Sequence, residues 1–133
     1  MDLASLDFGK NPEITAIMNV IHPITGEEMF QEDGTHVTVT LLGMESSIAK
    51  RIIKARAQKQ LNKRNQKVDL DEAREFTISL QAKLITASQG LTENGQDLDL
   101  TDQATAIDVL TRYSWLREQI DEFIADRANF YKA

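Results

Sequence analysis

Residues 37–55, VTVTLLGMESSIAKRIIKA, decide the fold because the hydrophobic period changes within this stretch. Up to Leu42, apolar residues alternate with threonines, which is typical of a strand with one buried face. Beyond Gly43 the apolar residues recur every three or four positions, as they do along one face of an α-helix. The stretch therefore predicts a strand that is followed directly by a helix.

Upstream of this stretch, residues 16–43 predict a small antiparallel β unit. Ile17–Ile21 is short and apolar and is expected to be a strand. The segment His22–Glu27 (HPITGE) favours a turn, because proline presets φ and glycine accepts a left-handed conformation. Met29–Gln31 is a candidate return strand. Residues 1–15 have no sustained period, and we expect them to form a flexible N-terminal arm.

Downstream, residues 46–131 predict a helical part. We expect helices that begin near Ser46, Asp69, Asp102 and Trp115, and end near Arg64, Gly90, Arg112 and Tyr131. An Asn94-Gly95 pair between the second and third helices indicates a tight turn or minimal hairpin. The sequence thus predicts a single, mainly helical α+β domain over residues 16–133, in which the N-terminal antiparallel β unit packs on about four helices.

Capping patterns refine these helices. Asp69 is an expected N-cap, and Gly90 suits the C-terminal cap of the same helix. Thr101 is the expected cap of the short helix and Ser114 that of the last one. The positions expected to face inward on the short helix are Ala104, Ile107 and Leu110.

The formal net charge of −6 is distributed unevenly. Residues 46–67 contain eight basic residues and no acid, whereas residues 91–126 contain nine acids and two arginines. Beyond Ala57 the helical stripe of the basic segment consists of lysines, which a core does not bury. We therefore expect residues 57–64 to project from the domain, into solvent or towards something acidic. The basic candidates for partner binding are Lys54, Lys59, Lys63 and Arg64.

Four further side chains are candidates for partner binding. Ile78 and Ile85 lie seven residues apart, on a second face of the helix that begins near Asp69. Trp115 suits either a core anchor or an interface. Arg127 falls within the apolar stripe of the last helix, so we expect it to pair with a carboxylate or with helix-terminal carbonyls while its stem packs on nearby phenylalanines. Contact with a partner chain is the alternative for Arg127.

Several function classes have few candidate residues. The chain has no cysteine and two histidines, and it contains none of the common phosphate-loop, hydrolase or zinc-protease motifs. We therefore expect no catalytic residues, no metal site and no cofactor. No run approaches the roughly 18 apolar residues of a membrane-spanning helix. The basic segment lacks aromatic residues for base stacking, which disfavours nucleic acid as a partner.

Four segments carry a resemblance to a known family. They are His22–Glu27 between two expected strands, Leu91–Gly95 before the short helix, Tyr113–Ile120 (YSWLREQI) and Phe123–Phe130 (FIADRANF). In this order, and with a helix rich in Ala, Lys and Arg between the first two, they resemble the small tail assembly chaperones of long-tailed bacteriophages and prophages. The similarity extends over roughly residues 16–131, and the tryptophan-containing segment carries most of it.

The resemblance implies a non-enzymatic chaperone that binds the tape measure protein in the cytoplasm of the bacterial host. Such a chaperone is released before the virion is complete. The resemblance also implies a longer form made by ribosomal frameshifting. Apart from the resemblance, the opposed charges of residues 46–67 and 91–126 suggest head-to-tail self-association of several copies. The alternatives are a structural tail-completion or connector protein of the virion and, with less support, a nucleic-acid-binding regulator.

Overall fold

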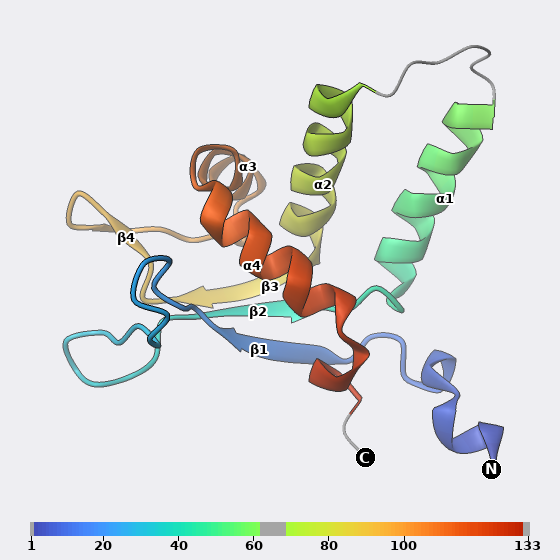
Figure 1. The fold of residues 1–133 in the computed structure, drawn as a ribbon, viewed down its shortest axis with the longest axis horizontal. Coiled ribbons are helices and arrows are strands. Elements are labelled where there is room, and N and C mark those ends of the chain that lie inside the picture. Colours follow the sequence, from blue (N-terminus) through green and yellow to red (C-terminus); the bar gives the residue numbers. More distant parts are fainter. Residues whose placement is uncertain (1, 62–68, 132–133) are drawn as a thin grey trace.

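A computed structural model describes residues 2–61 and 69–131, which form a three-stranded antiparallel sheet with helices on one face (Figure 1). The strands are β1 (Thr15–Asn19), β2 (Thr38–Leu42) and β3 (Ile85–Gln89), with β2 in the centre. Within the described part of the chain, four α-helices accompany this small sheet, which confirms the predicted, mainly helical α+β class.

The β1–β2 ladder places Ile17 opposite Thr40, and it extends to a hydrogen bond of 2.9 Å from the Val20 amide to the Val37 carbonyl. The intervening chain forms only isolated bridges, at Ile21 and at Phe30, so the expected return strand is reduced to these contacts. The central strand finds its second neighbour in β3, much later in the chain.

The helix α2 (Leu70–Leu84) ends at Leu84, before the predicted end at Gly90. The strand β3 begins directly after it, at Ile85. The expectation of one helix up to Gly90 was wrong, because pairing with the free edge of β2 outweighs continuation of the helical stripe. Gly90 has a φ of 84° at the end of β3. A Cβ atom there would lie 2.7 Å from Cγ of Gln31, so both backbone and space require glycine.

The beginnings of α1 (Ser47–Leu61) and α2 follow the capping rules. The Asp69 carboxylate accepts hydrogen bonds from the amides of Asp71 and Glu72, at 3.0 and 3.2 Å, which confirms it as an N-cap. Before α1, the buried Ser46 hydroxyl donates to the Gly43 carbonyl at 2.7 Å. This bond fixes the corner between β2 and α1.

A two-residue turn joins β4 (Thr92–Glu93) to β5 (Gln96–Asp97) in a minimal hairpin, which confirms the turn predicted at Asn94-Gly95. Asn94 has a φ of 52° and Gly95 a φ of 81°. Positive φ at both positions is the requirement of the tight hairpin turn that this dipeptide favours.

The short helix α3 (Gln103–Arg112) is capped by Asp102 rather than by Thr101. Its buried residues are Ala106, Val109 and Leu110, whereas Ala104 and Ile107 are exposed. The expected inward face was therefore correct only at Leu110. The helix starts one residue later than predicted, but this shift does not change which residues share a face. The face that is buried is the one that contacts α2 and α4.

The last helix, α4 (Ser114–Ala125), is shorter than predicted, and Tyr113 occupies its N-cap position without a side-chain bond. The chain leaves the helix at Asp126, whose carboxylate accepts from the Ala128 amide at 3.0 Å and starts the 3₁₀ turn η3 (Arg127–Asn129). An aspartate that bonds the backbone two residues on competes with helix continuation.

The N-terminal arm contains two 3₁₀ turns, η1 (Leu3–Leu6) and η2 (Phe8–Lys10). The Phe8 ring lies 4.7 Å from the Tyr131 ring, and the Tyr131 hydroxyl donates to the Asn11 carbonyl at 3.1 Å. These contacts join the two ends of the chain; the flexibility of the arm stays a prediction.

Candidate partner-binding site

A groove of about 310 Å³ lies between α1 and α2, where α1 stands on the outer side of α2, away from α3 (Figure 1). We call it the α1–α2 groove. Its lining comes from one face of each helix: Ile52, Ala55, Arg56, Lys59, Glu72, Phe76 and Lys83. Spacings of three, four and seven positions along α1, and of four, seven and eleven along α2, bring these side chains to a common side.

The floor of the α1–α2 groove is apolar. Ile52 and Phe76 are half-buried and pack against the hydrophobic core. The Arg56 guanidinium lies over the Phe76 ring, with Cζ 4.2 Å from the ring centroid. This is the geometry of a cation–π contact, in which the ring face attracts the positive charge. The free groove is therefore partly covered by its own arginine.

The rim is mainly positive, because Arg56, Lys59 and Lys83 contribute three cations against the carboxylate of Glu72. Arg56 and Lys59 belong to the basic segment recognised in the sequence, whereas Lys83 comes from a different helix. Sequence reasoning missed Lys83 and Phe76 as site residues. The heptad spacing of Phe76 and Lys83 on α2 was the available signal, but their proximity to α1 required the tertiary structure.

The outer end of the helix pair is exposed. Residues 57–61 are all exposed, and the side chains that flank the connection between the helices, Leu61 and Leu70, are 83% and 78% exposed. Ala49 is the one buried residue among the fifteen of α1. The prediction that the helix projects beyond Ala57 is thus confirmed as far as Leu61.

The other basic candidates differ in position. Lys54 is exposed on α1 and does not line the groove. Lys59 lies on the groove rim. Lys63 and Arg64 fall outside the described residues.

The apolar candidates do not form a surface. Ile78 and Ile85 are 4% and 6% exposed and belong to the hydrophobic core. Their assignment as partner contacts is corrected, because Ile85 leaves the helix for β3 and Ile78 faces the interior of the domain. Trp115 is half-buried and packs against the same core.

Arg127 pairs with a carboxylate, as predicted: its Nε lies 2.9 Å from Oε1 of Glu45. Its environment differs from the expectation, since the side chain is 64% exposed and lies 5.8 Å from the Phe8 ring centroid rather than within a buried helical stripe. Oε2 of Glu45 also lies 3.4 Å from Nζ of Lys50. The Arg127 hydrogen bond, followed by Lys50, lowers the pKa of Glu45 below its ordinary value.

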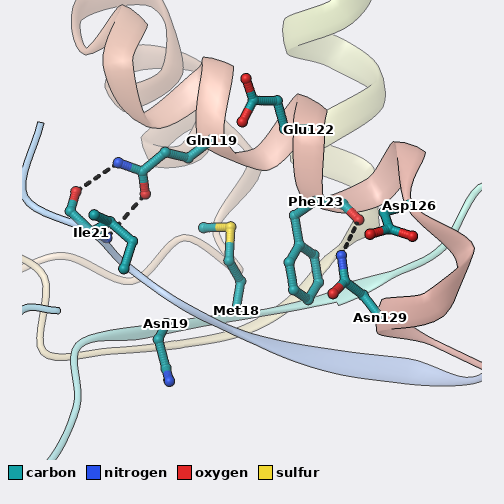
Figure 2. Close-up of a pocket in the computed structure, with 8 residues that line it drawn as sticks. All are labelled: Met18, Asn19, Ile21, Gln119, Glu122, Phe123, Asp126 and Asn129. Atoms are coloured by element: carbon teal, nitrogen blue, oxygen red, sulfur yellow. Dashed lines mark hydrogen bonds between the residues drawn. The ribbon is translucent and has the colours of Figure 1, made fainter. Parts of the chain in front are cut away.

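A second pocket, of about 340 Å³, lies between β1 and α4 (Figure 2). Some of its polar side chains serve the fold: the Gln119 side chain accepts from the Ile21 amide at 3.0 Å and donates to the Ile21 carbonyl at 2.6 Å. Asn129 Nδ2 donates to the Phe123 carbonyl at 2.9 Å, which anchors the turn after α4. These bonds give the pocket a structural role.

Arg112 contacts two of the nine acids in residues 91–126, Glu93 and Asp108. The guanidinium lies 2.7 Å from Glu93 and 2.6 Å from Asp108, while the Tyr113 hydroxyl donates to Glu93. Arg112, followed by Tyr113, lowers the pKa of Glu93, and the bond to Glu93 raises the pKa of Tyr113. These contacts tie the β4–β5 hairpin to α3.

Within residues 2–61 and 69–131, no three His, Asp or Glu side chains are arranged to hold a metal ion. No helix in the same part of the chain combines the length and apolar character needed to cross a bilayer.

The sequence matches no protein-family model, and no curated protein or solved structure shows significant similarity to it.

Proposed function

We propose that this chain is a non-enzymatic assembly chaperone of a long-tailed phage or prophage, which binds the tape measure protein in the host cytoplasm. One observation carries the proposal: an α1–α2 groove with an apolar floor and a cationic rim, which runs along a helix pair whose outer end is exposed. The resemblance of the His22–Glu27 and Tyr113–Phe130 segments to that family supplies the identity of the partner.

The groove suits a helical ligand. The lining of the groove on α1 runs from Ile52 to Lys59, which is about 10 Å or roughly two helical turns. An amphipathic helix of similar length places apolar anchors at positions i, i+3, i+4 and i+7 along such a groove. A long helical protein exposes stripes of this kind before it is assembled, and covering them prevents aggregation.

Co-expression tests the proposal directly. The tagged chain is produced together with the tape measure protein that the proposal expects to be encoded in the same tail gene cluster, and co-purification and the soluble fraction of the tape measure protein are measured. We expect the chain to be retained with its partner and to raise its solubility. Absence of both effects removes the proposal.

Mass spectrometry of purified virions separates a chaperone from a structural tail component. A chaperone is released before completion, so its peptides are expected in infected-cell lysates and absent from particles. Stoichiometric presence in particles identifies a tail-completion or connector protein instead.

A further inference from the structure

We infer that the segment bound in the α1–α2 groove is an amphipathic helix whose apolar stripe is bordered by aspartate and glutamate. The inference rests on the proposed function and specifies the part of the partner that is recognised. It follows from the charges of α1, from the position of Arg56, and from the apolar floor.

All the charged side chains of helix α1 are positive. It contains five cations and no acid: Lys50, Arg51, Lys54, Arg56 and Lys59. Among the described residues, Lys50 is the one cation of α1 that forms a salt bridge, with Glu45 at 3.4 Å, and that pair lies at the base of the helix. Arg56 and Lys59 are the two of these cations that line the groove, and a partner helix with acidic borders complements them; complementary charge increases both association rate and selectivity.

Arg56 gives this complementarity a specific geometry. In the free chain its guanidinium covers Phe76 at 4.2 Å. A partner carboxylate offers the guanidinium a charged, two-pronged hydrogen-bond acceptor, which is stronger than the ring face. Arg56 then moves to the carboxylate, and the uncovered Phe76 ring and Ile52 accept an apolar anchor of the partner.

Nucleic acid is the other polyanion that these cations could meet. Its phosphates would leave the apolar floor at Ile52 unfilled, and its dense charge would be opposed by a chain of net charge −6. An acidic amphipathic helix fills the floor and brings few charges. The observations therefore favour the helix, and duplex DNA becomes a competitor in the test.

Two synthetic peptides of about 20 residues test the inference, a length that extends along the whole groove. Both carry the same apolar stripe; one has glutamate at the bordering positions and the other lysine. Binding to the full chain is measured by fluorescence anisotropy at low and high salt. We expect the glutamate peptide to bind at least about tenfold more tightly, a difference of about 1.4 kcal/mol, and to weaken as salt rises.

Charge reversal locates the site. Arg56→Glu with Lys59→Glu is expected to weaken the glutamate peptide about tenfold or more and to strengthen the lysine peptide. Arg51→Glu with Lys54→Glu is the matched control, since it makes the same charge change on exposed positions of the same helix that do not line the groove. Its expected loss is below about threefold, because separated surface charges are screened.

Three results overturn the inference: equal binding of the two peptides, equal losses in both double variants, or displacement of the glutamate peptide by a short DNA duplex. Lys59→Glu alone covers the case in which the Arg56 variant fails to fold, because Lys59 is exposed. Retention of the tape measure protein by the groove variant refutes the acidic-helix inference and leaves the chaperone proposal standing. Failure of the parent chain to retain it refutes the chaperone proposal itself.

Discussion

Gln119 on α4 acts as a substitute strand partner for Ile21, and its replacement has a calculable effect. Two backbone hydrogen bonds form the bridge between Ile21 and Glu28. The Val20 carbonyl accepts from the Met29 amide at 3.1 Å, and the His22 amide donates to the Glu27 carbonyl at 2.8 Å. The amide and carbonyl of Ile21 point the other way and meet the Gln119 side chain at 3.0 and 2.6 Å (Figure 2).

Gln119→Ala removes both hydrogen bonds, so the half-buried amide and carbonyl of Ile21 lose their side-chain partner. At about 1 kcal/mol per bond, the free energy of unfolding falls by about 2 kcal/mol. For a chain of 133 residues this lowers Tm by about 5–10 °C. Glu118→Ala is the matched control, because Glu118 is the exposed neighbour on the same helix. Its expected change is within about 0.5 kcal/mol.

Gln119→Glu separates the two bonds. The introduced carboxylate still accepts from the Ile21 amide, but it has no proton for the Ile21 carbonyl. Protonation restores that donor, so the folded-state pKa of the new carboxyl is raised above its unfolded value. The variant therefore comes closest to the parent below about pH 4 and loses stability as pH rises through the folded pKa.

Urea unfolding, followed by far-UV circular dichroism and Trp115 fluorescence at pH 7 and pH 4, measures these differences. An Ala variant within about 0.5 kcal/mol of the parent shows that water replaces both bonds at no cost, which refutes the reasoning. A pH-independent deficit in the Glu variant contradicts the assignment of Gln119 Nε2 as donor.

Further predictions concern an ion pair, a turn and a helix face. Glu45→Gln is expected to cost up to about 1 kcal/mol at pH 7; because the folded pKa of Glu45 is lowered, the difference disappears as pH falls through that value, and an unchanged difference at pH 3 contradicts it. Gly90→Ala should destabilise more than Gly95→Ala in urea unfolding, since both require positive φ but only the former places a Cβ 2.7 Å from a glutamine side chain; equal effects refute the steric contribution. Leu110→Ala should cost about 2–5 kcal/mol and Ile107→Ala under about 1 kcal/mol, because these residues of α3 are 0% and 42% exposed; comparably large losses at both positions would restore the face expected from the sequence.

The candidate site was only partly predictable. The projecting basic helix and Lys59 could be predicted from the high density of positive charge and from the replacement of apolar residues by lysines beyond Ala57. Both properties depend only on residues that are close in sequence. Phe76 could not be recognised as part of the site, since its role depends on the angle at which α2 approaches α1. Ile78 and Ile85 were chosen from a helical period that the chain abandons at Leu84.

By itself the sequence determined the strand at Thr38–Leu42, the cap at Asp69 and the turn at Asn94-Gly95, because each depends on side chains that act within a few residues of their own backbone. Only the tertiary structure decided where α2 gives way to β3. The free edge of β2 offered that segment backbone hydrogen bonds across 44 residues of sequence, from Leu41 to Ile85, and no local period indicates such a partner. The same long-range packing placed an arginine of one helix over a phenylalanine of the next, and so made a groove from two ordinary amphipathic faces.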